Sequence, residues 1–163
     1  MLSYSTNNTV DITVRIALLI MSKQTDEVSN QSHLFYIDHT HILQELISTD
    51  NATSWRSGPL GNSTVEASAS AKALTAFHSE KWLGSDSLNT AGMRLYYGAP
   101  DNQVHELAFF INDTAWSSQF VFKGTNGNAG LTSSWTDSTG RANLYLLNMD
   151  NDLKIWSSDI AVL

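Results

Sequence analysis

The chain has 163 residues and a formal charge of −7, with 9 Lys and Arg against 16 Asp and Glu. This balance argues against a nucleic-acid partner, which would need a cationic face. The chain contains no Cys, so disulfides, zinc–thiolate sites and iron–sulfur clusters are excluded, and no cofactor is expected. Hydrophobic residues make up 42% and charged residues 15% of the chain, which is typical of a globular protein with a packed core.

The first patterned segment is residues 10–16, where apolar and polar side chains alternate and predict a half-buried strand. An apolar run follows at residues 16–21. It is far shorter than the roughly 20 residues that a membrane span needs, so it predicts a buried strand. The first fifteen residues contain one basic residue, Arg15, and lack the basic start and apolar stretch of a signal peptide. We therefore expect no membrane insertion and a cytoplasmic or unconventionally secreted protein.

Three segments of the chain resemble one another in sequence. The second segment follows the first by 61 residues at every matched position, and the third follows the second by 49 residues. The first segment comprises His33–Tyr36, Glu45 and Trp55, and the second comprises Arg94–Tyr97, Glu106 and Trp116. The third comprises Asn143–Leu146, with Asp150–Asn151 matching Asp101–Asn102 and with Ile155 in the place of the Glu.

Each aromatic segment is preceded by a short apolar strip, at residues 17–20, 73–76 and 130–133, and is followed by a polar hairpin turn. Three antiparallel modules of about 50 residues are typical of a β-propeller, so we predict an all-β fold in a single domain, with about three four-stranded blades in the chain. The predicted blades are 1–52, 53–113 and 114–163, with a Trp opening the next module. Residues 57–71 and 80–90 are rich in Ser, Gly and Asn and predict loops.

Three blades are too few for a ring, because closed propellers typically have 4–8 blades. The sequence therefore predicts half of a six-bladed propeller. Two explanations stay open: a homodimer that completes the ring, or a chain that is one piece of a longer propeller. An isolated half would leave apolar blade faces and sheet edges exposed to water.

Several of these segments resemble the fungal fucose-specific lectins of the six-bladed propeller type. The residues that carry the resemblance are Leu131–Trp135, Met93–Tyr97, and Asp101–Asn102 followed by His105–Leu107. The similarity extends from about residue 15 to the C-terminus. It implies non-catalytic binding of fucosylated or related glycans, in a family whose full domain is about twice as long.

The resemblance implies one sugar pocket formed by Arg94, Glu106, Phe109 and Trp135. Arg supplies a fixed fork of donors, Glu accepts from sugar hydroxyls, and an aromatic ring covers the apolar side of a pyranose. A second site at His33 and Glu45 lacks the Arg, and Ser48 stands in the place of its aromatic residue. The third repeat has lost both polar ligands. Without the repeat, Arg94 and Glu106 would be interpreted as a surface ion pair, which contributes about 0–1 kcal/mol.

Two other functional classes were weighed. A glycosidase needs two carboxylates at a defined separation, but Glu45 and Glu106 occupy equivalent positions in different blades, so we predict no enzyme. A degenerate propeller that binds proteins rather than sugars is the alternative function. His39 and His41, and the acidic turn at residues 148–152, are interpreted as hairpin turns rather than metal sites.

Overall fold

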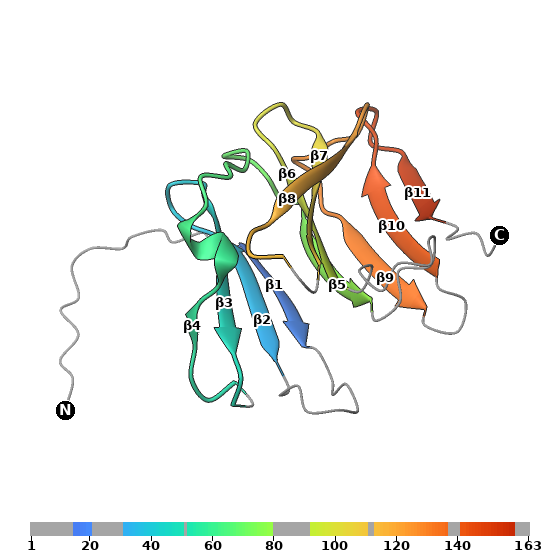
Figure 1. The fold of residues 1–163 in the computed structure, drawn as a ribbon. Coiled ribbons are helices and arrows are strands. Elements are labelled where there is room, and N and C mark those ends of the chain that lie inside the picture. The colour runs from blue at the N-terminus through green and yellow to red at the C-terminus, as the bar shows by residue number, and fades with distance from the viewer. Residues whose placement is uncertain are drawn as a thin grey trace, which may run out of the picture.

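The structure is a computed structural model, and it describes residues 15–20, 31–50, 52–79, 92–110, 113–136 and 141–158. Within these residues the chain forms three antiparallel β-sheets that stand side by side (Figure 1). The predicted all-β propeller architecture is confirmed. No helix in the described part of the chain has the length and apolar character needed to cross a membrane.

The three sheets follow one another along the chain. The first contains β1 (Arg15–Ile20), β2 (Ser32–Ile37), β3 (Leu43–Ser48) and β4 (Arg56–Ser57), followed by the short 3₁₀ helix η1 (Pro59–Asn62). The second contains β5 (Leu74–Ser79), β6 (Gly92–Gly98), β7 (Val104–Phe110) and β8 (Ser117–Phe122). The third contains β9 (Thr132–Thr136), β10 (Arg141–Leu147) and β11 (Leu153–Ser158).

The sheets are arranged as propeller blades. The first strand of the second sheet, β5, lies beside the first strands of both neighbouring sheets, β1 and β9. Each sheet then runs outward by antiparallel pairing from its first strand (Figure 1). The predicted strand at residues 16–21 is β1, which ends at Ile20. The remainder of the predicted strand at residues 10–16, before Arg15, lies outside the described residues.

The sheet boundaries differ from the predicted blade boundaries. Trp55 and Trp116 do not open the next blade, because each precedes the fourth strand of its own sheet, β4 or β8. A repeat gives the spacing of equivalent residues but not the point at which each unit begins, and the polar residues before each Trp resemble linkers. The predicted loop at 57–71 contains η1, and the one at 80–90, which includes Trp82, lies outside the described residues.

The repeat extends to the backbone of the hairpin turns. His41, Asn102 and Asn151 keep the spacings of 61 and 49 residues and have φ values of 67°, 62° and 65°. In each turn this residue donates its N–H to the carbonyl three residues earlier, at 2.9–3.0 Å. Asn adopts this left-handed conformation at low cost because its short side chain bonds locally. The predicted hairpins are confirmed, and His41 belongs to a turn.

The middle sheet is covered on both faces, so every residue of β6 from Met93 to Gly98 is buried. Successive side chains of a strand point to opposite faces. Leu95 and Tyr97 therefore pack in one apolar cluster with Phe35 of the first sheet. Tyr96 packs in a second cluster with Leu144 of the third sheet. Two seams between sheets result, and the candidate site lies at the second of them.

Candidate functional site

Arg94 and Glu106 meet on the face of the second sheet that packs against the third sheet. Arg94 lies opposite Ala108, and Glu106 lies opposite Tyr96, so the two side chains are diagonal neighbours on one face. The distance from Arg94 Nε to Glu106 Oε1 is 3.1 Å, and the side chains are only 7% and 9% exposed. The pair predicted from the repeat is therefore formed, and it is a buried ion pair rather than a surface one.

Burial dominates the electrostatics of this pair. Desolvation raises the pKa of Glu106, although the positive charge of Arg94 and the nearby Tyr96 hydroxyl oppose the shift. Desolvation likewise lowers the pKa of Arg94, against the attraction of Glu106. A buried ion pair rarely adds net stability over apolar side chains, because desolvating two charges is costly.

Two aromatic residues, Tyr96 and Phe110, lie beside the Arg94–Glu106 pair. The Tyr96 side chain is fully buried, and its hydroxyl has no hydrogen-bond partner of good geometry among the described residues. Burial, reinforced by the negative charge of Glu106, raises the pKa of Tyr96. The Arg94 guanidinium carbon lies 4.7 Å from the centre of the Phe110 ring, which is a cation–π distance.

Phe109, a predicted site residue, is not brought to this pair. It lies opposite Met93 and packs in the first seam, with its ring 5.5 Å from that of Trp116. The alternation of a strand places residues 106, 108 and 110 on one face. Phe110, which the sequence analysis missed, therefore takes the aromatic position beside Arg94. The two-residue period of a strand, applied from Glu106, would have identified Phe110 from the sequence.

Trp135, the fourth predicted site residue, belongs to β9 of the third sheet. Its backbone pairs with Ala142 of β10, and Ala142 is buried in the cluster between the second and third sheets. The side chain of Trp135 lies outside the described part of the structure, so its role in the pocket stays a prediction.

The equivalent residues in the first sheet, His33 and Glu45, are hydrogen-bonded to one another, and Glu45 is also bonded to other groups of the chain. His33 donates from Nδ1 to Glu45 Oε1 at 2.7 Å. The other carboxylate oxygen accepts from the Leu60 backbone N–H and from the Trp116 indole N–H, both at 3.0 Å. Trp116 also packs edge-to-face on Phe35, with ring centres 5.4 Å apart. The Glu45 carboxylate is thus held by three donors.

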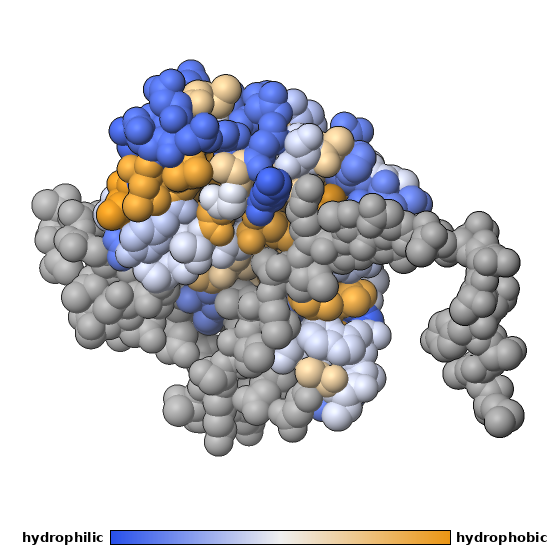
Figure 2. Space-filling view, turned by 180° about the vertical axis from the view of Figure 1, so that it is seen from behind, coloured by the Kyte–Doolittle hydropathy of each residue, from blue (hydrophilic) through white to orange (hydrophobic). Residues whose placement is uncertain are grey.

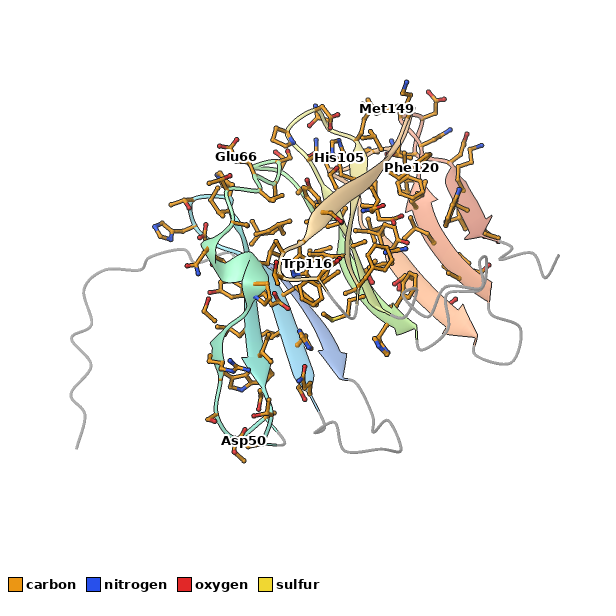
Figure 3. The ribbon with its side chains drawn as sticks, in the orientation of Figure 1. Asp50, Glu66, His105, Trp116, Phe120 and Met149 are labelled. Carbon is orange, nitrogen blue, oxygen red and sulfur yellow. The ribbon has the colours of Figure 1, made fainter. Side chains whose placement is uncertain are left out.

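Trp116 therefore lies in the first seam and donates to Glu45 across it (Figure 3). This arrangement also involves Gly58, because a Cβ at this position would lie 2.5 Å from Glu45 Cδ. In the weaker second site predicted at His33 and Glu45, the Glu45 carboxylate is held by donors of the chain itself, while His33 Nε2 is buried without a hydrogen-bond partner among the described residues. A role of this pair in sugar binding stays a prediction. The hydrogen bond from Trp116 to Glu45 was not predicted from the sequence.

The third sheet carries no equivalent pair, as the repeat indicated. Asn143 stands in the place of Arg94, and its side-chain oxygen accepts from the Ser157 hydroxyl at 2.7 Å. Ile155 stands in the place of Glu106 and is 60% exposed. Among the described residues, no group of three His, Cys, Asp or Glu side chains is arranged to hold a metal ion.

Comparison with known proteins agrees on the fold. No protein-family model matches the chain, and no curated protein matches it. Among solved structures, the six-bladed β-propeller Aleuria aurantia lectin matches with a TM-score of 0.65 and 19% identity, covering 90% of this chain and 43% of that one. A mutant of the same lectin in complex with alpha-methyl-L-fucoside matches with a TM-score of 0.66 at 19% identity and the same coverage.

A shorter neighbour also matches. A fucose lectin from Kordia zhangzhouensis in complex with methyl-fucoside gives a TM-score of 0.60 at 20% identity, covering 87% of this chain and 92% of that one. This chain thus spans less than half of the Aleuria lectin chains and nearly all of the Kordia chain. The described chain has the fold of half of a six-bladed β-propeller.

Proposed function

We propose that this protein binds carbohydrate without catalysing a reaction. The proposed pocket lies at the seam between the second and third sheets, and the bound sugar is fucose or a close relative. The observation that carries the proposal is the buried Arg94–Glu106 pair beside the Tyr96 hydroxyl. The neighbours of the same fold that hold fucosides support it.

The chemistry of the seam suits a sugar. The guanidinium of Arg94 donates to ring and hydroxyl oxygens, and the Glu106 carboxylate accepts from hydroxyls in short, charge-assisted hydrogen bonds. Phe110, and Trp135 from the next sheet, supply aromatic surface for the apolar side of a pyranose or the methyl group of fucose. The two repeated carboxylates, Glu45 and Glu106, lie on different sheets, which favours binding over glycoside hydrolysis.

The contrast between the two seams supports a single pocket per chain. In the first seam the Trp116 indole covers and bonds Glu45. Among the described residues, no indole bonds Glu106 in this way, and its ionic partner is Arg94. A protein-binding scaffold without sugar binding was the alternative, and no observation among the described residues favours it.

We also propose that a second copy completes the ring. On the outward face of the first sheet, Leu34, Tyr36 and Leu46 are half-buried. They precede by 61 residues Leu95, Tyr97 and Leu107, which are buried in the first seam. The outward side of the third sheet exposes Leu153 at 65%, and Figure 2 shows apolar surface on that side of the molecule.

Two such faces suit head-to-tail packing that closes a ring. Sedimentation equilibrium is expected to give twice the 18.0 kDa of the chain. A well-folded monomer at micromolar concentration would refute closure by a second copy. A closed ring would place two pockets on one particle, and several weak sites together give useful avidity.

The sugar pocket is tested by calorimetric titration with methyl α-L-fucoside. Arg94→Ala and Glu106→Gln each remove one ligand-binding group, and each is expected to weaken binding by about tenfold or more, because one charge-assisted hydrogen bond is worth about 1.5–3 kcal/mol. Arg56→Ala, at an exposed arginine of β4, is the matched control and should bind as the wild type does. Wild-type protein that binds no fucoside or fucosylated glycan on an array would refute the proposal.

A further inference from the structure

A second cleft lies on the seam between the second and third sheets, and neither Arg94 nor Glu106 lines it. Its volume is about 530 Å³, within the range of small-molecule sites. It is bounded by the end of β8 and the turn after it on one side, and by β10 and β11 on the other. The residues that line it include Phe120, Phe122, Lys123, Asn148, Lys154 and Trp156.

The cleft has an aromatic floor. Phe120 and Phe122 lie edge-to-face with ring centres 4.9 Å apart, and Phe122 and Trp156 are nearly perpendicular at 5.4 Å. Phe120 is 52% exposed, and Figure 3 shows it between β8 and the third sheet. An exposed aromatic ring on an ordered floor is a platform for the apolar C–H face of a pyranose.

The rim of the cleft is positive. Lys123 and Lys154 are both exposed, and they are the only charged residues among those that line it. The nearest acid along the chain, Asp152, accepts from the Asn148 side chain at 3.2 Å within the hairpin turn. The chain as a whole carries −7, so two lysines without an acidic lining residue are a local departure from the overall charge. The charge of the cleft is complementary to an anion.

We propose that this cleft binds an acidic sugar residue, a pyranose that carries a carboxylate. The aromatic floor would stack on the ring, and the two ammonium groups would pair with the carboxylate. The ligand class differs from the neutral sugar proposed for the Arg94 pocket. The two sites adjoin, because Phe120 lies opposite Glu106 in the β7–β8 register, but neither Arg94 nor Glu106 lines the cleft.

The test compares ligands that differ in one group. Binding of methyl β-D-glucuronide, methyl β-D-glucoside and benzoate is followed by NMR titration at low ionic strength. The glucuronide is expected to bind about five- to tenfold more tightly than the glucoside, in line with one or two exposed charge pairs. Added salt should reduce this preference, because exposed pairs are screened. Benzoate carries the charge and an apolar ring without sugar hydroxyls, and it should bind more weakly than the glucuronide.

Variants assign the effect to the cleft. The double substitution Lys123→Ala with Lys154→Ala should abolish the preference for the glucuronide, whereas Lys72→Ala, at an exposed lysine outside the cleft, should keep it. Phe120→Ala should weaken both sugars. An unchanged urea midpoint verifies folding of each variant. In Arg94→Ala, glucuronide binding should persist, which separates this site from the proposed fucose pocket.

Three results would overturn the proposal. Equal affinity for glucuronide and glucoside would refute the role of the lysines. Benzoate binding as tightly as the glucuronide would show an apolar-anion site rather than a sugar site. No saturable binding of the glucuronide at millimolar concentration would show that the cleft is not a ligand site, as would be the case if a strand from another chain covers it.

Discussion

The closure of the first seam by Trp116 gives the sharpest stability prediction. Trp116→Phe keeps an aromatic ring against Phe35 but removes the indole N–H that donates to Glu45 at 3.0 Å. The carboxylate is buried, so the lost donor leaves part of its charge without a partner. A hydrogen bond to a charged group contributes about 1.5–3 kcal/mol, and we therefore expect a loss of about 2 kcal/mol of unfolding free energy.

Urea denaturation followed by circular dichroism measures this loss. A change of 1 kcal/mol moves the melting temperature of a protein of this size by about 2–4 °C, so the melting temperature should fall by about 4–8 °C. Trp55→Phe is the matched control, because Trp55 is the equivalent residue one repeat earlier and is exposed. It should change stability by about 0.5 kcal/mol or less.

A double-mutant cycle separates the hydrogen bond from general packing. Combining Trp116→Phe with Glu45→Gln should cost less than the sum of the two single changes, because each removes one end of the same charged contact. The reasoning would be refuted by additive losses, or by a Trp116→Phe protein as stable as the wild type.

Three further predictions concern the two seams. Gly58→Ala should lower the unfolding free energy by about 1–3 kcal/mol, because the added Cβ would overlap the Glu45 side chain. Gly130→Ala is the control and should be tolerated, because the added atom has open space around it. Equal urea midpoints of the two variants would contradict the predicted clash at Gly58. Tyr96→Phe should leave the unfolding free energy unchanged or slightly raised, since the hydroxyl has no hydrogen-bond partner of good geometry among the described residues. The same substitution should weaken fucoside binding. A large loss of stability would show that the hydroxyl is hydrogen-bonded in the folded protein. The raised pKa of Glu106 means that ionisation of its carboxyl is less favourable in the folded state than in the unfolded state. The unfolding free energy should therefore fall as pH rises from below 4.5 through the raised pKa. Glu106→Gln should remove this part of the pH dependence, and identical pH profiles of stability for the variant and the wild type would refute the reasoning.

Much of the fold followed from the sequence, because the repeat is constrained at several levels at once. The spacings of 61 and 49 residues hold for the aromatic strands and also for the left-handed turn residues His41, Asn102 and Asn151. Tight turns need a particular backbone conformation, so they preserve spacing even where side chains change. The predicted blade boundaries differ from the sheets because the Trp residues introduce the last strand of a sheet rather than the first of the next.

The site was predicted in part. Arg94 and Glu106 were paired correctly because both lie on neighbouring strands of one repeat. Phe109 was assigned to them by distance along the chain, although the two-residue period of the strand places Phe110 on their face. The bond between Trp116 and Glu45 joins residues 71 positions apart. No local pattern contains it, because it depends on how one sheet packs on the next.

The most direct test of sugar binding at this seam observes Arg94 itself. The Nε–H resonance of Arg94, assigned by its disappearance in Arg94→Lys, should shift as methyl α-L-fucoside is added and should saturate at the affinity measured by calorimetry. A resonance that does not move while the sugar binds would place the pocket elsewhere and contradict the proposed site.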